Sequence, residues 1–454
     1  MRLIVIGAGP GGYETAVEAR RRGFEVILVT SGKLGGTCLN QGCIPTKCFC
    51  HDARTGASLS EMVARKRLVV EKLGSGVEQM LKGVEIIRGI ARVADERTVL
   101  VWPTEEESIQ NQTSAENEPA LSLRADKIII ATGSHTAWLR IPGADTVAGV
   151  LSSTDILNLE EQPQRLTVIG GGVIGLEFAS IFNSLGSEVT VIEYCRNILP
   201  NLDSDIAKRL RQILSKRGVR FILGAAVTSI QASGEGQQVN YLAGNETGSI
   251  ESDKVLMACG RVPDVRVAYG CKGLEFNRKG IVVDENMQTS LKGVYAVGDV
   301  NGKMMLAHAA VFQGKVALNH ICESEGLPVH SRIRQDIMPS AVFTSPPLSS
   351  VGLSEEACKE RGIEYKVFKS LYGASGMALA SDCGEGICKV LAAKPGQEGF
   401  RDWQILGCHI VGENAPDLIS EVSVLMNYDA TVDELSDIIH PHPSFSELIL
   451  NAVK

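Results

Sequence analysis

The fold is decided near the N-terminus by the stretch Leu3-Ile-Val-Ile-Gly7-Ala-Gly9-Pro-Gly-Gly12. An apolar segment typical of a buried strand runs directly into a G-x-G-x-x-G turn, and the residues after it favour a helix. In such a turn Gly7 allows the sharp bend, Gly9 lets the backbone approach a pyrophosphate, and Gly12 lets the helix pack on the strand. The N-terminus of the helix presents free N–H groups to phosphate. The stretch therefore predicts a dinucleotide-binding unit.

The same pattern returns 163 residues later as Leu166-Thr-Val-Ile-Gly170-Gly-Gly172-Val-Ile-Gly175. Each copy continues into a helical stretch and then into a second apolar strand, Glu25–Val29 in the first and Glu188–Ile192 in the second. One G-x-G-x-x-G is often only a glycine-rich turn, whereas two copies in the same context are much more specific. We therefore expect an α/β chain with two Rossmann-like dinucleotide-binding domains.

Two such sites in one chain indicate two different dinucleotides. The second copy ends in Glu193, about 20 residues past its glycines, where a carboxylate binds a ribose 2′-OH and repels a 2′-phosphate. Glu193 therefore favours NAD over NADP, although Arg196 argues mildly the other way. The first copy has Thr30 at the corresponding place, and a hydroxyl there would meet a ribose less strongly than a carboxylate does.

The composition excludes several classes of protein. A chain of 454 residues suggests two to four domains, and the net charge of -8 argues against nucleic acid as a partner. No apolar run reaches the length of a membrane span, and the N-terminus becomes glycine-rich too soon for a signal peptide. We expect a cytoplasmic protein whose cysteines are mostly reduced thiols.

Two of those cysteines lie in Gly35-Gly-Thr-Cys38-Leu-Asn-Gln-Gly-Cys43-Ile-Pro-Thr-Lys47, where their spacing would allow a small disulfide ring. The residues from Cys43 toward Asp52 predict a helix entered near Pro45, and a helix N-terminus stabilises a thiolate. Lys47 follows on the same helical face. The alternatives are a pair of structural thiols or a metal site. A zinc site would need two more ligands in a matching context, so we expect no metal.

The other cysteines provide a control for this interpretation. Cys383 and Cys388 have the same spacing, but a turn and a strand surround them, so we interpret them as ordinary thiols. Cys48 and Cys50 should point to other faces of the helix that begins near Cys43, and we expect them to be packing residues.

The stretch from Gly35 to Lys47 resembles the redox-disulfide signature of the flavin-dependent pyridine nucleotide–disulfide oxidoreductases. Further motifs resemble this family in the same order along essentially the whole chain: Ala131-Thr-Gly133, Gly260-Arg-Val-Pro263, Tyr295-Ala-Val-Gly298-Asp299 and Leu306-Ala-His308. Two positions depart from the family pattern, Asp264 in place of Asn and Pro347 in place of Glu. The Pro347 departure raises a question about local strand geometry.

The resemblance implies FAD and NAD as cofactors and assigns residues to each. The FAD contacts would be Gly7, Gly9, Gly12, Thr30, Gly36, Thr37, Lys47, Ala131, Thr132, Gly133, Gly298, Asp299, Leu306, Ala307 and His308. The NAD contacts would be Gly170, Gly172, Val173, Ile174, Gly175, Glu193, Gly260 and Arg261. It also implies that Glu177 pairs with Lys47 beside the flavin.

A second set of candidate catalytic residues lies near the end of the sequence, in His440-Pro-His442-Pro-Ser-Phe-Ser-Glu447. A histidine is suited to proton transfer near neutral pH, and a carboxylate can orient its imidazole. A surface turn or a metal ligand is the alternative for a His-x-His pattern alone. The family resemblance makes His442 and Glu447 an acid–base pair that serves the partner subunit, which implies a homodimer.

Within the family, Leu39-Asn40 and Ile44–Lys47 look most like the dihydrolipoamide dehydrogenases. The implied reaction oxidises dihydrolipoamide, carried on lipoyl domains of a 2-oxoacid dehydrogenase or glycine cleavage complex, and reduces NAD+. In that reaction, Cys38 undergoes thiol–disulfide exchange with the substrate, and Cys43 transfers electrons to the flavin. The alternatives are a reductase of a glutathione-type or coenzyme A-type disulfide, and a mainly structural subunit.

The expected domain order follows from these motifs. Residues 1–143 and 264–334 would form the FAD domain with its central extension, 144–263 the NAD domain, and 335–454 an α+β dimerisation domain. The acidic run from Thr104 to Pro119 is typical of a solvated hairpin extension.

Overall fold

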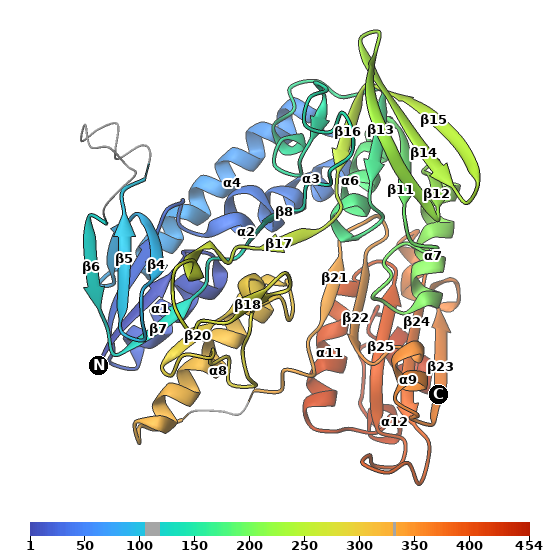
Figure 1. The fold of residues 1–454 in the computed structure, drawn as a ribbon. Helices are drawn as coiled ribbons and strands as arrows, with labels where there is room; N and C mark the ends of the chain where they lie inside the picture. The colour runs from blue at the N-terminus through green and yellow to red at the C-terminus, as the bar shows by residue number, and fades with distance from the viewer. Residues whose placement is uncertain (105–118, 330–332) are drawn as a thin grey trace. The chain divides into compact units, whose positions relative to one another are not determined.

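Strand β1 and the turn after it organise the first of two units into which the chain divides. The computed structural model describes residues 1–104, 119–329 and 333–454 (Figure 1). Contacts within the chain separate unit 1 (Met1–Pro45, Ala64–Ala137 and Arg261–Gln335) from unit 2 (Thr46–Val63, Trp138–Gly260 and Asp336–Lys454). The predicted division into four regions stays a prediction.

Unit 1 is built on a five-stranded parallel sheet in the order β20-β7-β1-β2-β3. Its strands are β1 (Arg2–Ile6), β2 (Glu25–Thr30), β3 (Glu85–Arg88), β7 (Lys127–Ile130) and β20 (Val294–Ala296). Leu3 to Ile6 are all buried. Because both faces of this parallel sheet are covered, its strands are apolar along their whole length. Helices α1 (Pro10–Arg21) and α8 (Ala307–Ser324) pack against each other beside this sheet.

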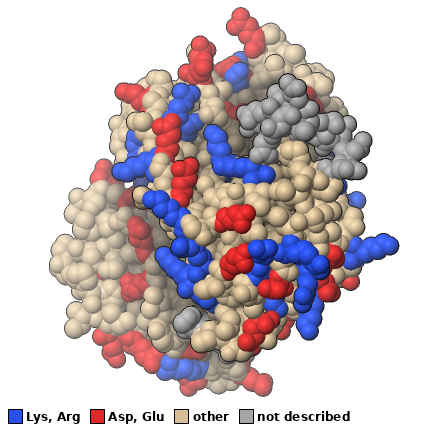
Figure 2. Space-filling model, turned by 90° about the vertical axis from the view of Figure 1, so that its left-hand side faces the viewer, with Lys and Arg blue, Asp and Glu red and all other residues tan. Residues whose placement is uncertain are grey.

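The remaining elements of unit 1 are short. They are α2 (Gly36–Gln41), β4 (Ile90–Val93), β5 (Thr98–Trp102), β6 (Leu121–Arg124), β8 (Ser134–Thr136), β17 (Arg261–Pro263), η2 (Arg266–Ala268), β18 (Phe276–Asn277), β19 (Gly280–Ile281) and η3 (Gly298–Asn301). Helices α3 (Cys43–Thr55) and α4 (Leu59–Met80) each run from one unit into the other. On the face drawn in Figure 2, Lys and Arg are interspersed with Asp and Glu.

Unit 2 repeats the architecture of the first sheet with a second five-stranded parallel sheet, in the order β12-β11-β10-β16-β9. Its strands and helices are β9 (Val150–Leu151), η1 (Ile156–Asn158), β10 (Arg165–Ile169), α6 (Val173–Ser184), β11 (Glu188–Glu193), α7 (Ser204–Lys216), β12 (Arg220–Leu223) and β16 (Lys254–Met257). Strand β10 lies between β11 and β16 as β1 lies between β2 and β7. The duplication predicted from the glycine motifs is therefore confirmed in the strand order.

Each parallel sheet is accompanied by a three-stranded antiparallel sheet. In unit 1 this is β4-β5-β6, and in unit 2 it is β13 (Ala225–Ser233), β14 (Gly236–Ala243) and β15 (Glu246–Ser252). The predicted extension between β5 and β6, Thr104 to Pro119, lies outside the described residues except at its two ends.

The C-terminal part of unit 2 is an antiparallel sheet with helices, as expected for an α+β domain. Its elements are β21 (Ser340–Val342), β22 (Leu348–Gly352), α9 (Glu355–Glu360), β23 (Tyr365–Leu371), η4 (Tyr372–Ala374), α10 (Gly376–Ala380), β24 (Ile387–Ala393), β25 (Ile405–Val411), α11 (Ala415–Asn427), α12 (Val432–Ser436) and α13 (Glu447–Val453). The sheet order is β21-β22-β25-β24-β23. The overall α/β class predicted from the sequence is confirmed.

The Pro347 departure does not disturb the strand that follows it. Gly412 donates its N–H to the Pro347 carbonyl at 2.9 Å, and β22 then pairs with both β21 and β25. A proline has no N–H to offer a sheet but keeps its carbonyl, so it is tolerated at the edge of the strand. Among the described helices, none is both long and apolar enough to cross a membrane.

Candidate active site

The two glycine turns leave open backbone at matching positions. Helix α1 begins directly after Gly9 and α6 directly after Gly172, and neither N-cap carries a side-chain cap. A Cβ built on Gly9 or Gly172 would meet nothing within 4 Å, so both positions face open space. By contrast, a Cβ on Gly12 or Gly175 would collide with the carbonyl of the first glycine of its turn. Both turns therefore fit a bound diphosphate, as the sequence predicts.

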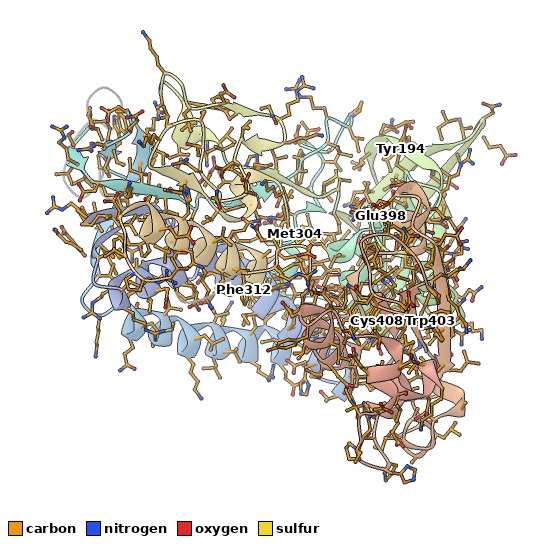
Figure 3. The ribbon with its side chains drawn as sticks, turned by 90° about the horizontal axis from the view of Figure 1, so that it is seen from below. Tyr194, Met304, Phe312, Glu398, Trp403 and Cys408 are labelled. Atoms are coloured by element: carbon orange, nitrogen blue, oxygen red, sulfur yellow. The ribbon has the colours of Figure 1, made fainter. Side chains whose placement is uncertain are left out.

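The residues predicted to contact the adenosine ribose differ between the two units. Glu193, at the end of β11, is 8% exposed and accepts hydrogen bonds from the N–H groups of Gly171 at 2.5 Å and Cys195 at 2.6 Å. Thr30, at the end of β2, has its hydroxyl in a local turn with Gly32. Tyr194, labelled in Figure 3, follows Glu193 and is largely exposed. The carboxylate is thus fixed at the position where the sequence predicts a ribose contact.

The cysteine segment lies against the first glycine turn. Gly35 and Gly36 both have positive φ, and a Cβ on Gly36 would lie 2.6 Å from the Gly9 Cα atom. Cys38 follows on α2 and is half-buried, while Cys43 is exposed and is the first residue of α3. The helix predicted over this segment is therefore confirmed, and it begins at Cys43, slightly before the predicted entry near Pro45.

Gly42, the residue directly before Cys43, lies close to the backbone of Cys38. A Cβ on Gly42 would lie 3.4 Å from the Cys38 Cα atom, so the chain turns back against α2 immediately before Cys43. This approach is compatible with the small ring that a disulfide between Cys38 and Cys43 would close, and the disulfide itself stays a prediction.

Lys47, on α3, forms an ion pair with Glu177 of α6, as the resemblance implies. The Lys47 Nζ atom donates to both carboxylate oxygens at 2.8 Å. The Glu177 side chain is 4% exposed and that of Lys47 is 30% exposed. Phe343 contacts both partners, because its N–H donates to Glu177 Oε1 at 2.9 Å and its ring centroid lies 4.6 Å from Lys47 Nζ. No motif in the sequence predicts this contact.

The second predicted FAD motif contains a small polar network. The hydroxyl of Ser134 donates to the Asp299 carboxylate, and Arg261 Nε donates to the Ser134 hydroxyl at 2.7 Å. Arg261 Nε lies 3.8 Å from Asp299 Oδ2, and burial lowers the pKa of this guanidinium. The resemblance assigned Arg261 to NAD, but the structure places it in unit 1 beside Asp299, so that assignment stays a prediction.

The remaining predicted FAD contacts lie at the ends of elements in unit 1. Ala131, Thr132 and Gly133 follow β7, and Gly298 opens η3. Leu306 is the N-cap of α8, which begins with Ala307 and His308. Phe312, also on α8, is labelled in Figure 3 and is 40% exposed. Strand ends and helix N-termini of this kind are where α/β sheets bind nucleotides.

The histidine–carboxylate pair at the C-terminus is formed as predicted. His442 Nδ1 lies 3.0 Å from Glu447 Oε1, and Ser444 donates its N–H to Glu447 Oε2 at 2.9 Å. The contact with His442, and after it the one with Ser444, holds the pKa of the Glu447 carboxyl below its ordinary value. The His442 side chain is 80% exposed, so the second imidazole nitrogen is accessible from outside the subunit.

A second pair lies beside it. His440 Nε2 lies 2.8 Å from Glu421 Oε1 of α11, and His440 Nδ1 lies 2.9 Å from the carbonyl of Ile438. The His440 side chain is 4% exposed. The two histidines therefore differ in access, and only His442 presents its ring to solvent.

The control cysteines have the surroundings of ordinary thiols. Cys388, on β24, is fully buried in the same core as Cys408 of β25, which Figure 3 labels. Burial raises the pKa of the Cys383 thiol, and burial also raises the pKa of Cys50 to about 12. Cys48 is 6% exposed. In the described part of the chain, no group of three or more His, Cys, Asp or Glu residues is arranged to hold a metal ion.

Comparison with known families agrees with this geometry. Residues 1–314 match the family model for pyridine nucleotide-disulphide oxidoreductases, and residues 338–453 match the dimerisation domain of the same family. The chain belongs to this family. Members of this pyridine nucleotide–disulfide oxidoreductase family use FAD together with NAD(P)H, and the match to the dimerisation domain supports a homodimer.

Relatives within the family carry more than one name. The chain is 34% identical to a dihydrolipoyl dehydrogenase of Bacillus subtilis over 98% of its own length and 96% of that protein. It is 35% identical to a leghemoglobin reductase of Glycine max over 99% of its length and 86% of that protein. A solved structure of the HOCl-induced flavoprotein disulfide reductase RclA from Escherichia coli superposes with a TM-score of 0.86 at 30% identity, covering 100% and 99% of the two chains.

Proposed function

We propose that this flavoprotein oxidises protein-bound dihydrolipoamide to lipoamide and reduces NAD+ to NADH. The observation that carries the proposal is the His442–Glu447 pair, with its 3.0 Å contact and its exposed imidazole. A dithiol substrate must lose a proton before it can attack a disulfide, and an oriented histidine supplies that step. Several relatives that are 34–35% identical to this chain over 98–99% of its length are named dihydrolipoyl dehydrogenases. Their names favour dihydrolipoamide as the substrate.

In the proposed first step, His442 of the partner subunit takes the proton from one thiol of dihydrolipoamide. The resulting thiolate attacks the Cys38 sulfur, the Cys38–Cys43 bond breaks, and Cys43 leaves as a thiolate. The second substrate thiol then attacks the first substrate sulfur and passes its proton to the departing Cys38 sulfur, which closes the lipoamide ring and releases Cys38 as a thiol. Both enzyme cysteines are then reduced, and the two electrons of the dithiol are on the protein.

Cys43 and Lys47 would act on the cofactor side. Bound FAD supplies the two-electron chemistry that connects the dithiol with NAD+. Cys43 is the first residue of α3, where the helix dipole would stabilise a thiolate. Lys47, fixed by Glu177, provides positive charge one helical turn further along. The open backbone at Gly9 would hold the FAD diphosphate and that at Gly172 the NAD diphosphate.

Glu193 supports NAD as the nucleotide. Its buried carboxylate is fixed by two backbone N–H groups, and a carboxylate there would accept from a ribose 2′-OH and repel a 2′-phosphate. The natural partners would be lipoyl domains of a 2-oxoacid dehydrogenase or glycine cleavage complex, and a cytoplasmic location stays a prediction.

A second candidate substrate is another disulfide, of the glutathione or coenzyme A type. The similarity to a flavoprotein disulfide reductase over the full length of both chains favours it. Purified holoenzyme is assayed with dihydrolipoamide and NAD+, and with NADH and lipoamide, glutathione disulfide or coenzyme A disulfide. Dihydrolipoamide and lipoamide should be turned over fastest. Faster reduction of glutathione or coenzyme A disulfide would replace the proposal with this alternative, and no turnover of any substrate would favour a structural subunit.

A further inference from the structure

Phe343 contacts both members of the Lys47–Glu177 ion pair. Its backbone N–H donates to Glu177 Oε1 at 2.9 Å, which is the same oxygen that accepts from Lys47 at 2.8 Å. Its ring lies under the Lys47 ammonium, with 4.6 Å from Nζ to the centroid. The carboxylate and the ammonium are therefore both held by a single residue from the segment between β21 and β22.

The segment that carries Phe343 is itself fastened by three helices. Arg54, near the end of α3, donates to the Thr344 carbonyl at 2.9 Å. The N–H of Ser345 donates to the Ser180 hydroxyl on α6 at 2.9 Å. Arg217, which follows α7, donates to the Ser345 carbonyl at 2.7 Å. Because Ser180 lies three residues after Glu177 on α6, the helix that supplies the carboxylate also fixes the turn beside it.

The backbone bond and the ring of Phe343 act differently. Any residue except proline would donate the N–H to Glu177, so that contact does not require an aromatic side chain. The ring is different, because an ammonium on a flexible four-carbon stem has many orientations that satisfy one carboxylate. An aromatic face attracts the cation from a second direction and restricts those orientations. With 30% of its side chain exposed, Lys47 is not restricted by burial alone.

We propose that Phe343 is a positioning residue for the redox reaction. Its ring sets the direction of the Lys47 ammonium, and its N–H sets the Glu177 carboxylate, so that positive charge is held where the flavin ring gains negative charge on reduction. This inference rests on the proposed function, which places Lys47 at the flavin.

The experiment compares four single variants of the holoenzyme, and the double variant Phe343→Leu/Lys47→Met, with the wild type. Phe343→Leu removes the ring and keeps the N–H, whereas Phe343→Tyr keeps both. Lys47→Met removes the ammonium. Phe368→Leu is the matched control, since the Phe368 ring lies at the same 4.6 Å from a lysine, Lys366, away from the Lys47–Glu177 pair. The midpoint potential of bound FAD is measured by spectroscopic titration, and flavin reduction by NADH is measured by stopped flow.

Phe343→Leu should make the FAD midpoint potential more negative and slow flavin reduction about five-fold, the change expected from losing one cation–π contact. Lys47→Met should shift the potential in the same direction and further. Phe343→Leu should add nothing in the Lys47→Met background, because the ring then has no ammonium to hold. Phe343→Tyr and Phe368→Leu should match the wild type. If Phe343→Leu does not retain FAD, Phe343→Met replaces it with the same expectations.

A wild-type potential in Phe343→Leu together with a shifted potential in Lys47→Met would overturn the inference and leave the proposed function intact. A wild-type potential in Lys47→Met would show that Lys47 does not act on the flavin, and the inference would fail together with that part of the proposed function. No disulfide substrate enters the measurement, so an error in the choice of substrate would not affect its result.

Discussion

At the scale of single residues, the Glu447 carboxylate shows how the proposed proton transfer depends on charge. His442 and the Ser444 N–H lower the Glu447 pKa, so the pair is intact above the ordinary pKa of a glutamate and is lost as the pH falls through the lower value in the folded protein. Glu447→Gln removes the charge that stabilises the imidazolium. We expect the dithiol half-reaction to slow roughly 100-fold at neutral pH, with NADH oxidation by an artificial acceptor near the wild-type rate.

The measurement is a pair of pH profiles, one for each half-reaction. The difference between Glu447→Gln and the wild type should shrink at acid pH, where the wild-type carboxyl is also protonated. Glu421→Gln is the matched control, because it alters the neighbouring pair with buried His440 at a similar distance of 2.8 Å. Equal losses in both half-reactions of Glu447→Gln would contradict the acid–base role.

A separate prediction concerns the role of Glu193 in the preference for NAD+ over NADP+. Loss of its carboxylate removes a charged hydrogen-bond partner of the ribose, a contact worth about 1.5–3 kcal/mol. Glu193→Ala should therefore raise the KM for NAD+ roughly ten-fold or more and reduce the preference for NAD+ over NADP+. Steady-state kinetics with both nucleotides provide the check, and an unchanged preference would show that Glu193 only supports the local backbone through Gly171 and Cys195.

At the scale of elements, different glycines of one turn are expected to serve nucleotide binding and folding stability. A Cβ on Gly172 meets nothing within 4 Å, whereas one on Gly175 would lie 2.0 Å from the Gly170 carbonyl oxygen. Gly172→Ala should fold with the wild-type Tm and bind NADH more weakly, because the new methyl group occupies the space of the diphosphate. Gly175→Ala should lower the Tm. Thermal denaturation and NADH titration test the pair, and a lowered Tm with unchanged NADH affinity in Gly172→Ala would contradict the assignment.

Local patterns were sufficient to predict these elements. The apolar strands, the glycine spacing and the helix beginning at Cys43 depend on neighbouring residues, and each appears in the structure with nearly the predicted bounds. The antiparallel sheets beside the two parallel sheets and the contact of Phe343 with Lys47 were not predicted. Such contacts join residues far apart in the sequence, as between Glu177 and Phe343, and no local spacing reveals them.

At the scale of the whole molecule, an ion cluster within unit 2 joins α7 to the C-terminal sheet. Lys389 of β24 is 1% exposed and donates to both oxygens of fully buried Asp203 at 2.8 and 2.9 Å, and it also pairs with Glu355 at 2.5 Å. The sequence around Lys389 predicts a strand, but its partner at Asp203 lies 186 residues away, so a buried charge there could not be foreseen.

Removing one member of this cluster leaves uncompensated buried charge. Lys389→Met should lower the free energy of unfolding by about 3 kcal/mol or more. Lys369→Met is the matched control, because Lys369 pairs with Asp205 where both side chains are more than 40% exposed, and it should cost about 1 kcal/mol or less. Denaturant titration of both variants gives the comparison, and equal stabilities would show that the cluster does not hold α7 against the sheet.

The proposed reaction depends on Cys38 and Cys43 forming the redox centre for dihydrolipoamide. The most direct measurement is steady-state NADH formation from dihydrolipoamide and NAD+ by the wild type, by Cys38→Ser and by Cys383→Ser, whose cysteine has the same spacing to its neighbour. We predict that Cys38→Ser retains FAD and loses turnover by roughly 1,000-fold or more, as expected when a covalent nucleophilic step is removed. Cys383→Ser should match the wild type. Full activity in Cys38→Ser, or an equal loss in both variants, would contradict the proposed redox role of Cys38 and Cys43.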